Sequence, residues 1–168
     1  MNIIIQSSIH TLNKSKLLLT RLSNEELRNI SVPPYYSCIG SHIRHVLDFY
    51  DCILSGIKSA HVDLTNRERD IRLHEDCQYA HTNVIRVIDQ LDLLNTEDLK
   101  RSLIVLDDLG IGKVEIEYSL GAALAQANSH AIHHYAIINY ILDRLDISVE
   151  DETFGYNPTT PRPEINLI

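Results

Sequence analysis

The sequence predicts an all-α fold in which four long amphipathic helices form a bundle around a single core. Apolar residues recur with helical spacing over four long segments, and turn-forming residues separate those segments. Only one short stretch has the β-branched pattern of strands. The chain has 168 residues, of which 44% are apolar and 23% charged, as is typical of a globular protein. We therefore treat residues 1–168 as one domain.

The first two predicted helices are separated by a connection that contains two prolines. Leucines at helical spacing among polar residues predict a first helix from about residue 8 to residue 23. Pro33 and Pro34 prevent a helix from continuing through the connection. A second helix is therefore expected from about residue 38 to residue 58.

The second half of the chain is predicted to contain two more helices and a short hairpin. A polar segment, SAHVDLTNRERD, precedes a third helix over about residues 69–94. The β-branched stretches SLIVLDD and KVEIEYS, with glycines between them, predict a small β-hairpin before the last helix. That helix is expected over about residues 120–145, and the proline-containing residues 147–168 predict a non-helical tail.

Charge, hydropathy and cysteine content exclude several classes of protein. A net charge of -8 without a basic stripe argues against a nucleic-acid partner. No apolar run reaches the length of about 20 residues that a membrane span needs, and the first residues lack the pattern of a secretory signal. Cys38, Cys52 and Cys77 show neither a disulfide framework nor CxxC spacing. We therefore expect a cytoplasmic protein without a membrane or nucleic-acid partner.

Histidines gather in two of the predicted helices. Five of the nine lie in the segments GSHIRHVLDFYD and ANSHAIHHYAIINY. His130 and His134 are four residues apart, so they lie on one helix face, one turn from each other. Their predicted face also carries apolar residues, which indicates that it points to the interior of the bundle: Ala123, Ala127, Ile137 and Ile141. Two imidazoles in this arrangement can bind one metal ion.

A third ligand would have to come from another helix. His45 is the better candidate, because its predicted face also presents Phe49 and Cys52, which are expected to point to the core. His42, three residues earlier, is the rival candidate for the same role. Neutral imidazole is a common ligand of zinc, nickel and related divalent ions. The alternative is that these histidines only form hydrogen bonds with their neighbours.

Three charged residues near the second helix are candidates for catalysis and substrate binding. Asp48 lies three residues after His45 and could accept a proton or a hydrogen bond from a ligand imidazole. Arg67 and Arg69 could bind a substrate carboxylate or phosphate through two hydrogen bonds. The alternatives without a function are that Asp48 is a solvated carboxylate on the helix surface and that the arginines form salt bridges at a helix start.

The two histidine segments resemble motifs of the DinB/YfiT-like superfamily. The residues from His45 to Asp48 are similar to the HxxD motif of its second helix, and those from His130 to His134 to the HxxxH motif of its fourth. The resemblance implies a four-helix bundle with long crossover connections, commonly a homodimer. It also implies that His45, His130 and His134 hold a metal such as zinc or nickel.

The resemblance implies a function as well. Members of the superfamily include metal-dependent enzymes that use a low-molecular-weight thiol, so we expect a thiol-dependent S-transferase or a hydrolase acting on a small molecule. Many members continue the fourth-helix motif with Arg-Gly-Gln, whereas this chain has Tyr135, Ala136 and Ile137 at these positions. The resemblance therefore does not imply which substrate this protein uses. The alternative is a non-catalytic metal-binding or stress-response module. The sequence leaves open whether the protein is an enzyme.

Overall fold

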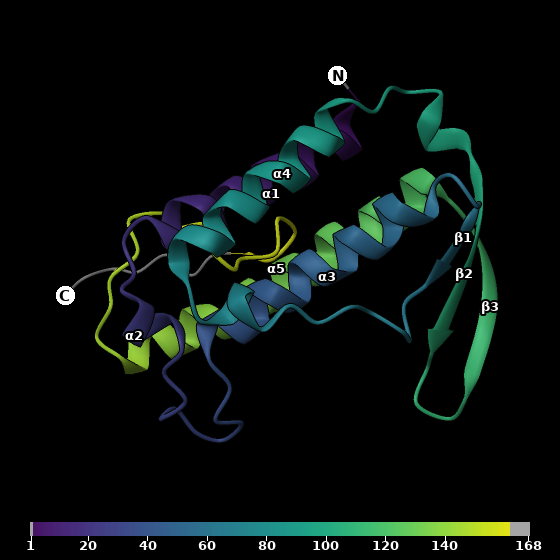
Figure 1. The fold of residues 1–168 in the computed structure, drawn as a ribbon. Helices are drawn as coiled ribbons and strands as arrows, with labels where there is room; N and C mark the ends of the chain where they lie inside the picture. Colours follow the sequence, from purple (N-terminus) through teal and green to yellow (C-terminus); the bar gives the residue numbers. More distant parts are fainter. Residues whose placement is uncertain (1, 162–168) are drawn as a thin grey trace.

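The computed structural model describes residues 2–161, in which long helices pack side by side and a small sheet extends at one end (Figure 1). The helices α1, α3, α4 and α5 share one core, and a short α2 lies beside them. The bounds of the helices, including the 3-10 helices η1 and η2, are α1 Ile3–Leu19, α2 Asn24–Leu27, α3 Ile39–Gly56, η1 Ile71–His74, α4 Cys77–Asp92, η2 Asp98–Lys100 and α5 Leu120–Arg144.

The all-α prediction is wrong, because the described residues also form a three-stranded mixed sheet. Its strands are β1 (His61–Asp63), β2 (Ser102–Asp108) and β3 (Lys113–Ser119), in the order β1-β2-β3. The β2 and β3 strands form an antiparallel hairpin over the two β-branched stretches, and β1 pairs with β2 in parallel. β1 lies in the segment that the sequence indicated to be a polar linker. Three residues are too few to show the alternation typical of a strand.

The third long helix begins later than its apolar pattern predicts. Asp70 caps η1 by accepting a hydrogen bond from the amide of Arg72, and Asp76 caps α4 by accepting one from the amide of Tyr79. Aspartate at a helix N-cap stabilises the first turn, so two caps six residues apart define two separate helices. The segment predicted as one helix from residue 69 is therefore a 3-10 turn followed by α4.

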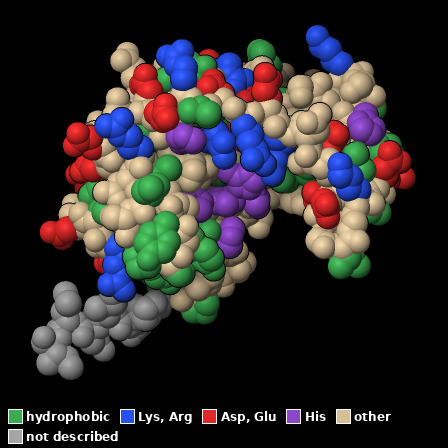
Figure 2. Space-filling view, turned by 60° about the horizontal axis from the view of Figure 1, so that its bottom comes forward, with side chains coloured by type: hydrophobic (Ala, Val, Ile, Leu, Met, Phe, Trp, Pro, Cys, Tyr) green, Lys and Arg blue, Asp and Glu red, His purple; other side chains and the backbone are tan. Residues whose placement is uncertain are grey.

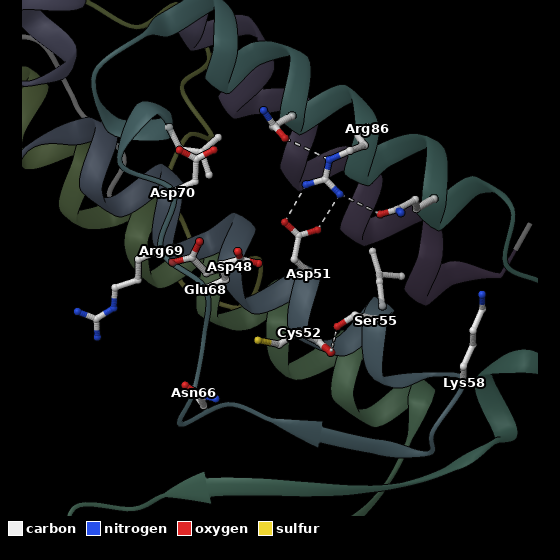
Figure 3. A pocket seen from close by; sticks show the side chains of 14 residues that line it. Asp48, Asp51, Cys52, Ser55, Lys58, Asn66, Glu68, Arg69, Asp70 and Arg86 are labelled. Atoms are coloured by element: carbon white, nitrogen blue, oxygen red, sulfur yellow. Dashed lines mark hydrogen bonds and ion pairs between the residues drawn. The ribbon is translucent and has the colours of Figure 1, made fainter.

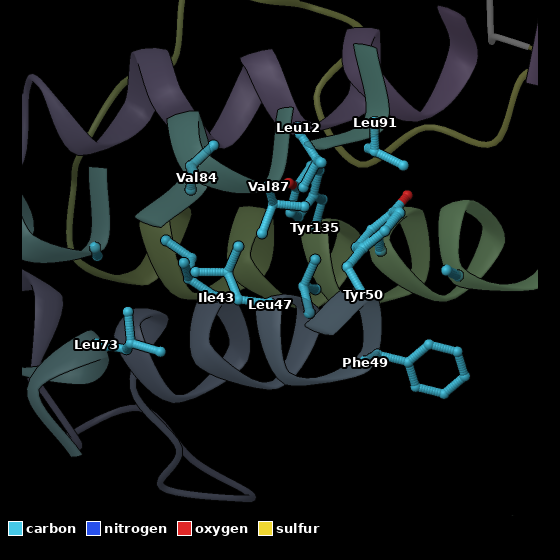
Figure 4. Packing of buried hydrophobic residues seen from close by; sticks show 14 of the residues in the cluster. Leu12, Ile43, Leu47, Phe49, Tyr50, Leu73, Val84, Val87, Leu91 and Tyr135 are labelled. Atoms are coloured by element: carbon cyan, nitrogen blue, oxygen red, sulfur yellow. The ribbon is translucent and has the colours of Figure 1, made fainter. Parts of the chain in front are cut away.

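Apolar side chains from all four long helices meet in one core (Figure 4). Leu12 of α1, Leu47 of α3, Val87 of α4 and Tyr135 of α5 are each at most 1% exposed. The core residues of α5 follow one another at intervals of three or four: Leu120, Leu124, Ala127, Ala131, Tyr135, Ile138 and Leu142. A side chain just outside this stripe lies at the edge of the core, where helices meet solvent.

Two glycines of α3 hold the following segment close to the helix. A Cβ atom on Gly56 would lie 2.5 Å from the carbonyl oxygen of His61, at the start of β1. A Cβ on Gly40 would lie 2.5 Å from the carbonyl oxygen of His74, at the end of η1. The segment between β1 and η1, residues 64–70, therefore runs along α3 from its end back toward its beginning. We call residues 64–70 the strap.

The tail and the cysteines complete the fold. Residues 147–161 form no helix, and Phe154 stacks on Tyr135 with ring centres 5.0 Å apart, whereas residues 162–168 of the predicted tail lie outside the described residues. Cys38, Cys52 and Cys77 are free thiols. Within residues 2–161, no helix combines the length and the apolar composition needed to cross a bilayer. The cytoplasmic location stays a prediction.

The close approach at Gly56 gives a test of the strap's anchoring. We expect Gly56→Ala to lower the free energy of unfolding by about 1–3 kcal/mol, because the new methyl group must displace the backbone of β1. Gly121→Ala, in the first turn of α5, is the matched control, since its Cβ would lie 3.2 Å or more from any neighbour. Urea denaturation measures both. Equal stability of the two variants would contradict the close approach.

Candidate metal centre

Histidines of α3 and α5 meet where these two helices pack together. On α3, Ile43 and Leu47 point into the core, and His42 and His45 occupy the neighbouring face of the helix. On α5, His130 and His134 each follow a core alanine by three residues. All four histidines are half-buried rather than enclosed in the bundle. Figure 2 shows histidine side chains gathered in a hollow of the surface, open to solvent.

Three of these imidazoles turn their nitrogen atoms toward one point. His130 Nε2 lies 2.9 Å from His45 Nε2 and 3.2 Å from His134 Nε2. The ligand atoms of all three lie within 4.8 Å of one another. Zinc binds imidazole nitrogen at about 2.0–2.1 Å, so two nitrogens of a tetrahedral site lie about 3.3 Å apart. The three side chains are therefore close enough to hold one metal ion with small adjustments.

The electrostatic environment keeps these imidazoles neutral. Burial lowers the pKa of His45 to about 4, with a further contribution from the positive charge of Arg67. Burial also lowers the pKa of His130 and, most strongly, that of His134, where the neighbouring histidines add to the effect. A neutral imidazole offers a free electron pair to a metal, whereas an imidazolium does not. The donor set fits a divalent transition metal at neutral pH.

His42, the rival ligand, lies behind His134. Its Nδ1 is 2.8 Å from Nδ1 of His134, and its Nε2 is 2.8 Å from the hydroxyl oxygen of Ser37. If His134 offers Nε2 to a metal, its Nδ1–H donates to Nδ1 of His42, whose Nε2–H donates to Ser37. A hydrogen bond of this kind fixes the orientation of a metal-binding imidazole and raises its basicity. The geometry thus gives His42 a supporting position.

Further aromatic rings border the three imidazoles. The Phe49 ring lies 4.9 Å from the ring of His130 and is buried, so it shields one side of that imidazole from water. His133 is exposed, with its ring 5.4 Å from that of His134. The centre therefore has a dry side toward Phe49 and a side that His133 borders and solvent reaches.

Asp48 does not support a ligand imidazole directly. Within residues 2–161 it forms no hydrogen bond with a histidine, and its nearest cation is Arg44, with Oδ2 and Nε 3.9 Å apart. Asp48 is 6% exposed, and burial raises its pKa to about 6 despite the nearby arginines. A carboxyl group that titrates near 6 can accept or release a proton close to neutral pH.

The two arginines proposed from the sequence lie in different surroundings. Arg67 is half-buried, and its charge acts on His45, His130, Cys52 and Asp48. Arg69 is exposed and points away from the neighbouring residues in Figure 3. It borders a hollow of about 940 Å³ beside α3, in which Arg86 and Asp51 form two hydrogen bonds of 2.7 and 2.8 Å. The structure thus brings only Arg67 near the histidines.

Reasoning from the sequence missed Ser37 and Arg44. Ser37 lies in the irregular segment before α3, where no periodicity indicates which way a side chain points. Arg44 sits on α3 next to His45, and its Nε is buried without a hydrogen-bond partner among the described residues. An arginine one residue before a candidate ligand was visible in the sequence, but its burial depends on tertiary packing that no local pattern encodes.

Comparisons with known proteins give no identification: no family model matches the chain, and no curated protein matches it in sequence. The resemblance to the DinB/YfiT-like superfamily therefore stays a prediction that rests on the short histidine segments.

The lowered pKa values predict how metal binding depends on pH. Protons compete with a metal only when the pH approaches the pKa of the free imidazoles. A site of three ordinary histidines, each with a pKa of about 6.5, would lose about a thousandfold in metal affinity between about pH 7.5 and about pH 5.5. Because His45 titrates near 4, we expect the affinity for Zn²⁺ to fall less than tenfold over this range. Competition with a chelator of known pH dependence measures this. A loss of a hundredfold or more would contradict the lowered values.

The hydrogen bonds behind His134 predict a graded effect on metal affinity. We expect His42→Ala to weaken Zn²⁺ binding about 10–100-fold, because His134 loses the acceptor that orients its ring. Ser37→Ala should weaken it less, and His42→Gln should restore part of the affinity through its amide oxygen. Ser41→Ala is the control, since its hydroxyl donates to the carbonyl of Cys38 and, among residues 2–161, forms no hydrogen bond with a histidine. Unchanged affinity in His42→Ala would rule out this role.

Proposed function

We propose that the protein is a metal-dependent enzyme in which His45, His130 and His134 hold one divalent transition-metal ion. Zinc and nickel are the proposed metals, because three neutral imidazoles form a donor set that suits both. The proposed substrate is a small molecule, and the reaction is either transfer of an electrophile to a thiol or hydrolysis. The DinB/YfiT-like resemblance supports the thiol-dependent reaction, including a low-molecular-weight thiol as its second substrate.

The observation that carries this proposal is the pairing of the convergent imidazoles with an open hollow. The three Nε2 atoms converge from two helices. The three residues are only half-buried, and histidine side chains lie in a hollow that is open at the surface (Figure 2). Three protein ligands with a remaining accessible position are typical of catalytic zinc sites, whereas structural sites are closed by four. An ion bound there would lower the pKa of a coordinated water or thiol and so provide a nucleophile at neutral pH.

The surrounding residues would then have separate tasks. His42 and Ser37 orient His134, and Phe49 excludes water from one side of His130. Asp48 is the proposed proton acceptor, because its pKa of about 6 would let it take up the proton that a water or thiol releases. The oxygen or sulfur of that nucleophile would then form a bond to the electrophilic atom of the substrate, whose bond to the leaving group breaks. The homodimer implied by the resemblance stays a prediction.

Metal analysis tests the first half of the proposal. The protein is prepared without a histidine tag, supplied with zinc or nickel, desalted and analysed by mass spectrometry of the metals. We expect about one equivalent for the wild type and less than a tenth for His45→Ala and His134→Ala. His10→Ala, on the exposed surface of α1, is the control and should retain the metal. Less than a tenth of an equivalent in the wild type would refute the metal centre.

Binding of an added ligand tests whether the centre is open. The protein is loaded with Co²⁺, whose absorption spectrum reports on its ligands, and 2-mercaptoethanol is added. A new charge-transfer band that saturates with thiol would support an open position. An unchanged spectrum at high thiol concentration would mean a filled shell, and would favour the non-catalytic metal-binding module over an enzyme.

A further inference from the structure

The strap places one cation against the histidines without giving it a partner. Arg67 is half-buried, and within residues 2–161 it makes neither a hydrogen bond nor an ion pair shorter than 4.0 Å. Its charge nevertheless acts on His45 of α3 and on His130 of α5. A partly buried guanidinium has lost part of its hydration, so a partner for its donors would stabilise it.

Both ends of the strap are fixed, so the position of Arg67 follows from the fold. At the first end, the amide of Leu64 donates to the carbonyl of Leu106 in β2, with N and O 2.9 Å apart. At the other end, the Tyr79 hydroxyl donates to Asp70 Oδ2 over 2.7 Å. The close contacts at Gly56 and Gly40 hold these ends against α3. The middle of the strap therefore crosses the middle of α3, where His45 lies.

The nearest carboxylate does not neutralise this region. Asp48 interacts with the charges of both arginines, but among the described residues only Arg44 comes within 4.0 Å of it, at 3.9 Å. Arg44 itself keeps its buried Nε without a hydrogen-bond partner among the described residues. The positive charges of Arg67 and Arg44 act on His45, whereas His130 is reached by the charge of Arg67 and by the opposing charge of Asp107. Figure 2 shows Lys and Arg side chains next to the histidines that gather in the hollow.

We infer that Arg67, with Arg44 beside it, forms an anion-binding subsite next to the metal position. The small molecule that reacts here then carries a carboxylate, sulfonate or phosphate group a few bonds from the atom that binds the metal. This inference rests on the proposed metal centre and adds the chemical class of its substrate. A guanidinium suits this task, because its planar N–H groups bind two oxygens of such an anion at once. A divalent ion would add two positive charges, which strengthens the selection for an anion.

Two thiols that differ only in charge test the subsite. On the Co²⁺-loaded protein, the dissociation constants of 3-mercaptopropane-1-sulfonate and 3-mercapto-1-propanol are measured from the charge-transfer band. We expect the wild type to bind the sulfonate about tenfold more tightly than the alcohol, as one charge-assisted interaction allows. Arg67→Gln should reduce this ratio to less than twofold. Arg69→Gln removes the exposed arginine two residues later and should leave the ratio of the two dissociation constants unchanged.

The outcomes separate the subsite from the metal centre. If the wild type binds both thiols equally, or if Arg67→Gln keeps the preference, the subsite is refuted and the metal centre stands. The Co²⁺ affinity of each variant is measured in parallel, so that loss of metal is not mistaken for loss of the anion.

A second measurement on the metal-free protein does not depend on the ion. Propanesulfonate is titrated while the Nε–H resonances of the arginines are followed by NMR, with Arg67 identified by its absence in Arg67→Gln. We expect a saturable shift of the Arg67 resonance and none of the Arg69 resonance. No shift at Arg67 would refute the subsite, whether or not the protein binds metal.

Discussion

The packing of α3 against α5 decides where every candidate ligand lies. His45 and His130 are 85 residues apart in the chain, yet their Nε2 atoms are 2.9 Å apart because the two helices bury neighbouring apolar stripes against each other. The stripe of α5 from Leu120 to Leu142 leaves His130 and His134 at the edge of the core. At that edge, the imidazoles are dry enough to stay neutral and close enough to solvent to meet a small molecule.

The strap depends on the same helix for its position. Gly56 and Gly40 allow the backbone of β1 and of η1 to approach α3, so the strap is held at both ends. It brings the charge of Arg67 to His45, while Arg44 and Asp48 of α3 form an ion pair one turn along the same helix. Burial then raises the pKa of Asp48 to about 6, while it lowers the pKa values of the histidines. Burial on α3 and α5 therefore favours the neutral form of the candidate ligands and of the neighbouring carboxyl group alike.

How far the sequence could predict the centre depends on which contacts are local. His130 and His134 lie on one helix, so their spacing alone places them one turn apart. The third ligand depends on how α3 and α5 pack, which no local pattern encodes. Spacing therefore does not decide whether His45 or His42 is the third ligand, and only the resemblance favours His45. In the structure, His42 contacts Nδ1 of His134 rather than the three convergent Nε2 atoms.

The errors in the predicted fold have similar causes. β1 is three residues long and exists through parallel pairing with β2, some forty residues later in the chain, so the all-α prediction missed it. The apolar residues before α4 have helical spacing, but the two aspartate caps divide that segment. Arg67 and Arg69 look alike in the sequence, and only the course of the strap distinguishes a half-buried side chain from an exposed one.

X-ray absorption spectroscopy of the zinc- or nickel-loaded protein is the sharpest test of the three-histidine centre, because it counts the ligands of the ion and identifies their atoms. We expect three imidazole nitrogens at about 2.0–2.1 Å for zinc and at least one oxygen ligand that an added thiol replaces with sulfur. Loss of one imidazole in His45→Ala should accompany loss of affinity. A shell of four protein ligands that thiol leaves unchanged, or a shell that keeps three imidazoles without His45, would contradict it.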